Sequence, residues 1–512
     1  MKKSLLLTLF IVLPRLVLAQ STASDLTDIK TNMEYLASDE LMGRETATDG
    51  EKIASDYIAK KLMEYGVKPF GDNGTYFQNY PLIQSRFLPG SKVKIYHDGK
   101  TAVYSFGKDF IIDARRNPDP AYLNKKSKMV FAGFGISAPE YNYDDYSALD
   151  ITGKTVFVLD DEPLSNDSTW FRGERATQYS FWGTKWRQAR ERGATGLVII
   201  ATDGTMDAWG RLSAWGEGSS IRYPDTSTSS GRNRIPVICV SPEMAKKLLK
   251  DEEYSYEELE RMFNEREKIP VFAMDKEIDF MLENTEEEVI SRNVVGIIEG
   301  TDPVLKNEYV SLGGHYDHLG NKTGVVYNGA DDNASGTVTV MDIAKRFAYS
   351  NENKRSIVVM LYSGEEEGLM GSRYASEHLP FIKDMVANIN MDMVGRMSED
   401  SLSVIGASRL STELGELVEE VNGRTSNFIF DYTFDAPDDP NRFYERSDHY
   451  NFARFGIPIV FFFDNMESDY HKPTDDFEKI NYAKIQRTSD LAYELALVIA
   501  NLDHKLTVDK QN

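Results

Sequence analysis

The feature that most constrains this chain is a regular alternation of apolar strands and amphipathic helices after Ser291. The strand-like runs are apolar almost throughout, and segments with one apolar helical face separate them. Strands that are apolar on both faces and joined by helices predict a mainly parallel sheet with helices on both sides, an α/β fold. We expect strands at 294–298, 309–313, 356–362, 386–391 and 457–463, and helices at 336–347, 410–422 and 481–502.

The rest of the chain falls into two further parts. Residues 26–36 and 53–62 each carry an apolar helical face, and Gly66 ends the second. Residues 121–282 show a different predicted pattern of secondary structure, in which short strands alternate with turns and short helices. A chain of 512 residues is long for a single core. We expect residues 20–120 and 283–505 to form one domain, with 121–282 inserted as a smaller domain and 506–512 as a tail.

The first residues predict export from the cell. Lys2 and Lys3 precede an apolar run at 5–13, and Ala19 provides a small residue for cleavage. This order is typical of a secretory signal peptide, residues 1–19. No later run reaches 18 apolar residues, so we expect no membrane anchor and a periplasmic or secreted protein.

Charge and cysteine content narrow the choice of partners and of stabilising bonds. The formal net charge is -23, which repels phosphate backbones and makes a nucleic-acid partner improbable on physical grounds. Cys239 is the single cysteine, so an internal disulfide is excluded. Because Cys239 lies in an apolar run, we predict that it is buried.

Clusters of imidazole and carboxylate side chains follow the predicted strands. In open α/β sheets the ligand crevice lies outside the carboxyl ends of the strands, so these clusters are expected to meet there. Carboxylates gathered in one crevice repel each other unless cations are bound. The clusters occupy residues 314–318, 329–336, 363–368, 390–392 and 470–476.

The residue types indicate zinc. Histidine nitrogen and carboxylate oxygen suit this ion, and no thiolate is available in the clusters. Two ions about 3.5–4 Å apart can share one carboxylate and one water, which becomes a nucleophile at neutral pH. A further carboxylate must then accept the proton of that water. Each cluster alone is as typical of a helix cap, a solvated helix face or a turn; their joint occurrence predicts a metal site.

The motifs resemble those of the zinc aminopeptidase family that also contains glutamate carboxypeptidase, transferrin-receptor ectodomains and glutaminyl cyclases. They are His-X-Asp at 315–317, Gly-Ala-Asp-Asp-Asn-Ala-Ser-Gly at 329–336, Gly-Glu-Glu-Glu-Gly-Leu-Met-Gly-Ser at 364–372, Asn-Met-Asp-Met-Val-Gly at 390–395 and Tyr-His-Lys-Pro-Thr-Asp-Asp at 470–476. The likeness extends to residues 36–45 and 446–449. Residues 144–146, 153–156, 192–196 and 235–237 resemble a protease-associated domain, which implies an inserted domain without catalytic residues.

The resemblance implies a role for each motif residue. His315 and Asp392 are expected to bind one zinc ion, and Glu366 and His471 the other. Asp331 is expected to bridge the two ions. Glu365 is the expected general base, which deprotonates the bridging water and returns the proton to the leaving amine.

Other residues are expected around the metals. Asp317 is implied to accept from the ring of His315 and fix its orientation. Tyr470 either donates to the tetrahedral oxyanion or packs beside the ligand. Arg446 either anchors substrate or forms a structural ion pair. His318 matches no ligand position and is predicted at the rim.

The predicted function is that of an exported di-zinc exopeptidase that removes single residues from the amino end of peptides. A carboxypeptidase is the main alternative, with Arg442 or Arg446 pairing with a substrate carboxylate. An aminopeptidase instead needs acidic groups for the substrate ammonium, and Asp435, Asp438 and Asp439 are available. A single-zinc glutaminyl cyclase and an inactive binding homologue are disfavoured by the complete ligand set. The preferred side chain and the oligomeric state stay open.

Overall fold

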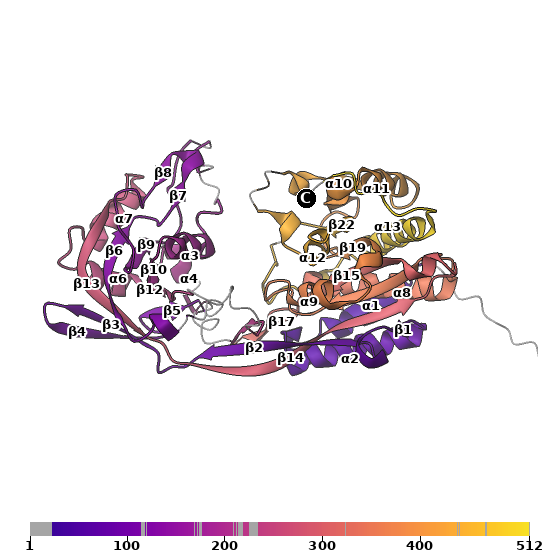
Figure 1. Ribbon diagram of the computed structural model, residues 1–512, viewed down its shortest axis with the longest axis horizontal. Helices are drawn as coiled ribbons and strands as arrows, with labels where there is room; N and C mark the ends of the chain where they lie inside the picture. Colours follow the sequence, from indigo (N-terminus) through magenta and orange to yellow (C-terminus); the bar gives the residue numbers. More distant parts are fainter. Residues whose placement is uncertain are drawn as a thin grey trace, which may run out of the picture.

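The chain folds into two lobes, each with its own sheet and hydrophobic core (Figure 1). The computed structural model describes residues 23–510 apart from 114–117, 119, 168, 172, 174–176, 208, 211, 213–218, 225–233, 323, 438, 440, 466 and 467. The predicted signal peptide, residues 1–19, lies outside these residues. Within the described part, no helix has both the length and the apolar character needed to span a membrane.

The larger lobe is built on a mixed sheet in the order β11-β2-β14-β18-β15-β19-β22-β20-β21, with β1 beside β14. Its centre consists of four parallel strands, β18, β15, β19 and β22, whose side chains are almost all buried. This confirms the predicted α/β class. The strands are β1 (Lys68–Pro69), β2 (Phe77–Phe87), β11 (Ser219–Arg222), β14 (Asn284–Ile298), β15 (Tyr309–His315), β18 (Ser356–Tyr362), β19 (Met385–Met391), β20 (Ser401–Ile405), β21 (Ile429–Asp431) and β22 (Ile459–Phe463).

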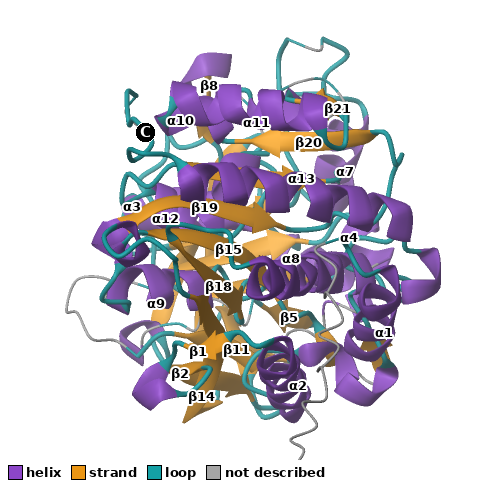
Figure 2. Cartoon of the chain, turned by 90° about the vertical axis from the view of Figure 1, so that its right-hand side faces the viewer, coloured by secondary structure: helices purple, strands orange, loops and turns teal. Residues whose placement is uncertain are grey.

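Helices cover both faces of this sheet (Figure 2). One layer consists of α1 (Leu26–Leu36), α2 (Asp49–Tyr65), α8 (Gly336–Ser350), α11 (Thr412–Arg424) and α13 (Tyr482–Asn501). The opposite layer contains α9 (Met370–His378) and α12 (His449–Ala453), with the short α10 (Ala407–Leu410) near β22. Helix α2 ends where Gly66 adopts a left-handed conformation, as the sequence predicts.

The second lobe has a sheet in the order β4-β3-β13-β6-β9-β10-β12-β5. Its core includes Cys239, which is fully buried as predicted. The strands are β3 (Lys92–His97), β4 (Lys100–Ser105), β5 (Phe110–Ile112), β6 (Lys126–Ala132), β9 (Thr155–Leu159), β10 (Gly196–Ile200), β12 (Val237–Val240) and β13 (Val271–Met281). The helices are α3 (Trp182–Glu191), α4 (Asp203–Asp207), α6 (Pro242–Leu249) and α7 (Tyr256–Asn264), and β7 (Ser137–Ala138) pairs with β8 (Tyr143–Asp144).

The boundary of the second lobe differs from the one expected from the sequence. Strands β3, β4 and β5, within residues 92–112, belong to its sheet, whereas the sequence analysis assigned residues up to 120 to the larger domain. The cause is long-range pairing, because β3 lies antiparallel to β13 nearly 190 residues later. The long strands β2 and β14 run side by side and link the two lobes (Figure 1).

Candidate metal centre

The parallel strands bring their following loops to one edge of the sheet. His315 is the last residue of β15, the glutamate motif follows β18, and Asp392 follows β19. The loop before α8 reaches the same edge, since α8 packs on β15 and β19. The short antiparallel pair β16 (Gly320–Lys322) and β17 (Val325–Tyr327) lies between these loops in sequence. The side chains that meet at this edge are His315, His318, Asp332, Glu365, Glu366, Asp392 and His471.

A first set of ligand atoms surrounds the Nε2 atom of His315. This atom lies 3.4 Å from Asp332 Oδ1 and 3.3 Å from Asp392 Oδ1, and all three side chains are buried. Ligands bound to zinc at about 2.0–2.1 Å in a tetrahedron are roughly 3.3 Å apart. The spacing of these nitrogen and oxygen atoms therefore fits a zinc ion.

A second set lies on the other side of Asp332. The Nε2 atom of His471 is 3.2 Å from Asp332 Oδ2 and 3.1 Å from Glu366 Oε2. The Nδ1 atom of His318 is 2.8 Å from Glu366 Oε1, yet the two atoms are not aligned as a hydrogen bond. Asp332 thus offers one carboxylate oxygen to each set, which is the arrangement that a pair of adjacent metal ions requires.

The structure places Asp332, and not the expected Asp331, between the two sets. Asp331 turns away from them, and its Oδ1 accepts the N–H of Gly395 at 2.8 Å. The carboxylate of Asp475 accepts the main-chain N–H groups of both aspartates, at 3.0–3.1 Å, and is itself paired with Arg396. This clamp fixes the loop so that the two neighbouring side chains point in different directions. The bridging position assigned to Asp331 from the motif therefore falls to Asp332.

Asp317 connects the first ligand set to the glutamate loop. The ring Nδ1 of His315 lies 3.2 Å from the main-chain oxygen of Asp317 and 3.6 Å from its carboxylate. The carboxylate of Asp317 accepts the N–H of Glu365 at 3.3 Å and the hydroxyl of Thr46 at 2.9 Å. The main-chain oxygen of Asp317 is thus closer to the His315 ring than its carboxylate is. The carboxylate of Asp317 also positions Glu365, the residue expected to act as general base.

Glu365 lies beside the ligand sets without belonging to either. Its Oε2 atom is 3.9 Å from His315 Nε2. Burial raises the pKa of Glu365 well above its usual range, and the carboxylates of Asp392 and Glu366 add to the effect. Burial likewise raises the pKa of Asp448 to about 7, and neither of its carboxylate oxygens forms a hydrogen bond with a described residue. This excess of buried carboxylate fits a site that binds cations, since bound cations favour the ionised forms.

Tyr470 and Arg446 line the cavity in front of the cluster, together with Glu365 and His471. The ring of Tyr470 stacks on that of His471 at 3.8 Å between centroids. Burial raises the pKa of Tyr470, so its hydroxyl stays protonated as a donor near neutral pH. The guanidinium of Arg446 lies 4.8 Å from the ring centre of Phe443. Both residues are therefore placed to contact a molecule in the cavity.

Two buried residues at the site were not recognised from the sequence. His318 was expected at the rim, but it is fully buried against Glu366. Arg44 is 1% exposed and donates to the main-chain oxygens of Leu36, Tyr316, Asn328 and Gly329. For His318 a signal existed, because it shares a strand-end loop with His315. Arg44 lies in the motif-like segment 36–45, but no role could be assigned to it from the sequence, because three of its four partners are main-chain oxygens at least 272 residues away.

Two of the acidic residues considered for binding a substrate ammonium, Asp435 and Asp439, are not among the described residues that line the cavity. Asp435 pairs with Arg409 and accepts the N–H of Gly406. Asp439 accepts the main-chain N–H groups of Asn441 and Phe443. Asp438 lies outside the described residues. The carboxylates that do line the cavity are those of Asp332, Glu365 and Asp392.

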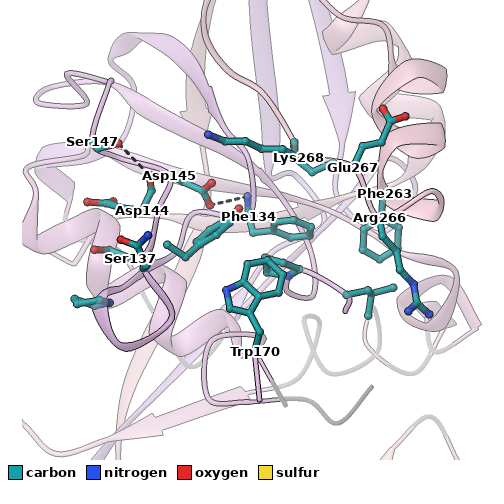
Figure 3. Close-up of a pocket in the computed structure, with 16 residues that line it drawn as sticks. Phe134, Ser137, Asp144, Asp145, Ser147, Trp170, Phe263, Arg266, Glu267 and Lys268 are labelled. Atoms are coloured by element: carbon teal, nitrogen blue, oxygen red, sulfur yellow. Dashed lines mark hydrogen bonds between the residues drawn. The ribbon is translucent and has the colours of Figure 1, made fainter. Parts of the chain in front are cut away.

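A larger cavity, about 780 Å³, lies in the second lobe (Figure 3). The rings of Phe134, Trp170 and Phe263 line it, with Lys268 and Asp145 beside them. The buried carboxylate of Asp145 already accepts the N–H groups of Phe134 and Ile136. The described residues that line this cavity include no histidine, so they do not offer the donor set found at the sheet edge.

The fold and the site together define an α/β protein with two adjacent metal-ligand sets that share one carboxylate. Residues 293–496 match the sequence model of peptidase family M28. A probable leucine aminopeptidase of Arthroderma benhamiae is 27% identical over 213 residues, which cover 38% of this chain and 56% of that protein. Aminopeptidase YwaD of Bacillus subtilis is 28% identical over 238 residues, or 44% and 50% of the two chains. The chain thus spans about half the length of these relatives.

Solved structures agree on the fold over nearly the whole chain. An aminopeptidase from Aneurinibacillus sp. strain AM-1 superposes with a TM-score of 0.59 at 18% identity, covering 96% of this chain and 97% of that one. BSAP, a zinc aminopeptidase from Bacillus subtilis, gives a TM-score of 0.55 at 20% identity, covering 96% and 99%. These structures confirm the fold, and the match of residues 293–496 to the family model agrees with the resemblance seen in the sequence motifs.

Proposed function

We propose that this protein is a zinc exopeptidase with two zinc ions, which releases single residues from the amino end of peptides. The observation that supports it best is the position of Asp332, with one carboxylate oxygen in each of two ligand sets and Glu365 beside them. The relatives named as aminopeptidases support the choice of reaction.

In this proposal His315 and Asp392 would hold one ion and Glu366 and His471 the other, and Asp332 would supply a ligand oxygen to each. When bound, the ions neutralise these carboxylates and make a water molecule nucleophilic at neutral pH.

The remaining residues act on protons and geometry. Glu365 accepts the proton of the attacking water and returns it to the leaving amine, for which its carboxylate is already positioned by the bond from its N–H to Asp317. Tyr470 donates a hydrogen bond from its hydroxyl to the oxygen that becomes negative as the amide carbonyl is attacked. His318 keeps Glu366 in its metal-binding orientation. Arg446 contacts the substrate.

The cavity also bears on which end of the peptide is bound. Asp332, Glu365 and Asp392 present carboxylates where an amino-terminal ammonium would lie next to the scissile amide. Apart from His471, expected as a metal ligand, Arg446 is the one basic side chain among the described residues lining this cavity. We therefore favour an aminopeptidase over a carboxypeptidase, with peptides and neither nucleic acid nor membrane lipid as partners.

Two further parts of the proposal concern the rest of the chain. Residues 1–19 act as a cleaved signal peptide, which would deliver the protein to the periplasm or the medium. The second lobe, described above by its sheet β4-β3-β13-β6-β9-β10-β12-β5, corresponds to the protease-associated domain suggested by the sequence motifs.

The test is a comparison of peptides with free and acetylated amino ends, with identification of the products. The zinc-loaded protein is expected to cleave leucyl-alanyl-phenylalanine to leucine and alanyl-phenylalanine and to leave its N-acetyl form intact. Release of phenylalanine from both peptides would identify a carboxypeptidase instead. Failure to cleave either, with two zinc ions bound, would refute a peptidase function.

A further inference from the structure

We infer that Arg446 binds a substrate carboxylate, and that the preferred substrates carry a carboxylate within one residue of the scissile amide. Free dipeptides are the simplest members of this class. The inference rests on the proposed peptidase function and adds the substrate class to it.

The first argument is the position of Arg446. Its side chain lines the same cavity as Glu365, Asp392 and His471, so a molecule bound for reaction lies within its reach. The guanidinium rests 4.8 Å from the ring centre of Phe443, a distance at which a cation is attracted to an aromatic ring. This contact holds the side chain at the cavity while its N–H donors stay available.

The second argument is that Arg446 has no anionic partner. No ion pair or side-chain hydrogen bond joins its guanidinium to another described residue, although the chain has an excess of acidic residues. Neighbouring arginines differ, because Arg442 pairs with Glu445 and Arg454 with Glu377. Arg446 is exposed where it lines the cavity and has no anionic partner among the described residues, so its guanidinium is available to a ligand.

The third argument is the balance of charge in the loaded site. The carboxylates of Asp332, Glu365, Glu366 and Asp392 are balanced by two divalent cations, so they do not compensate the charge of Arg446. A guanidinium presents a rigid fork of donors that matches a carboxylate. A substrate carboxylate close to the scissile amide therefore complements the charge of Arg446, which no other described residue of the loaded site balances.

The experiment uses the zinc-loaded full chain with five substrates. Leucyl-alanine carries a terminal carboxylate, and leucyl-alanine amide carries none. Leucyl-glutamate amide and glutamyl-alanine amide carry the carboxylate on a side chain after or before the scissile bond. N-acetyl-leucyl-alanine keeps the terminal carboxylate but lacks the ammonium. The variants are Arg446→Gln, Arg446→Lys, and Arg442→Gln as the matched control on the same loop.

We expect wild type to prefer leucyl-alanine over its amide, and Arg446→Gln to lower kcat/KM for leucyl-alanine roughly ten- to hundredfold, mainly through KM. The amide should change less than about threefold, because it makes no charged contact with Arg446. Arg446→Lys should restore part of the loss, and Arg442→Gln should match wild type. Whichever glutamate peptide behaves like leucyl-alanine identifies a side-chain carboxylate as a second source of the recognised group.

Three results separate failure of this inference from failure of the proposed function. Equal cleavage of leucyl-alanine and its amide by wild type and by Arg446→Gln would overturn the inference and leave the aminopeptidase intact. An equal loss on both substrates in Arg446→Gln would show a structural role and also overturn it. Cleavage of N-acetyl-leucyl-alanine at the rate of leucyl-alanine would instead refute the aminopeptidase.

Discussion

Replacing Asp332 by asparagine tests the central feature of the site, and Asp331→Asn is its matched control. Asp332 contributes one oxygen to each ligand set, at 3.4 Å from His315 Nε2 and 3.2 Å from His471 Nε2. Asparagine retains one oxygen but replaces the other by an amide nitrogen that cannot bind a metal ion. Asp332→Asn should therefore weaken both sites, whereas loss of any other ligand affects one directly.

The expected loss of zinc affinity in Asp332→Asn follows from the number of metal contacts that the substitution removes. Residues that only orient a ligand change metal affinity about 10- to 100-fold, so loss of a shared ligand should exceed about 100-fold. We expect kcat/KM to fall at least about a thousandfold, which corresponds to roughly 4 kcal/mol of transition-state stabilisation.

Asp331→Asn is expected to behave like wild type. Its Oδ1 accepts the N–H of Gly395, which the amide oxygen of asparagine can replace. Burial, together with the carboxylates of Asp475 and Asp464, raises the pKa of Asp331 well above its usual range, so a neutral amide suits this position. Stability should change by less than about 1 kcal/mol.

The assay combines elemental analysis of zinc after dialysis against a chelator series with the rate of leucyl-alanine hydrolysis. Asp332→Asn should retain less than one zinc per chain where wild type and Asp331→Asn retain two. The reasoning from the geometry is refuted if Asp331→Asn loses zinc and activity while Asp332→Asn keeps them.

Three further predictions concern the base, a buried cation and a buried imidazole. Glu365→Gln should keep wild-type zinc content and lose at least about a hundredfold in kcat, the contribution of a general base; loss of zinc would show that Glu365 is a ligand. Arg44→Met should weaken zinc binding about tenfold or more in chelator competition, because Arg44 joins the loops that carry His315 and Asp332. Arg44→Lys should recover part of the lost zinc affinity. Unchanged zinc affinity in both variants would exclude a positioning role for Arg44. Burial lowers the pKa of His449 to about 3, so the unfolded chain binds the extra proton between about pH 3 and 6.5, and stability is lost as the pH falls. Urea unfolding of the metal-free protein at pH 7 and pH 5 should show wild type losing about 2 kcal/mol more than His449→Phe; parallel losses would contradict this.

Much of the fold and of the site was accessible from the sequence. The near-continuous apolar runs at β15, β18, β19 and β22 could only be buried on both faces, so a parallel central sheet followed. Because the carboxyl ends of parallel strands meet at one edge, motifs placed after those strands had to converge.

The sequence could not show in which direction a side chain points or which strands far apart in the chain pair with each other. Asp331 and Asp332 are adjacent and chemically identical, and only the clamp formed by Asp475 and Arg396 decides which carboxylate faces His315 and His471. The same limit applies to Arg44, whose partners are main-chain oxygens.

Sequence alone therefore predicted the α/β fold class and the clustering of histidine and carboxylate side chains at the strand ends, since these depend on local periodicity and on residue types. The tertiary structure decided that β3 pairs with β13 in the second lobe, that His318 is buried against Glu366, and that Asp332 is the shared ligand. The physical reason is that side-chain direction and strand pairing depend on contacts between residues far apart in the chain, and such contacts leave no periodic signal in the sequence.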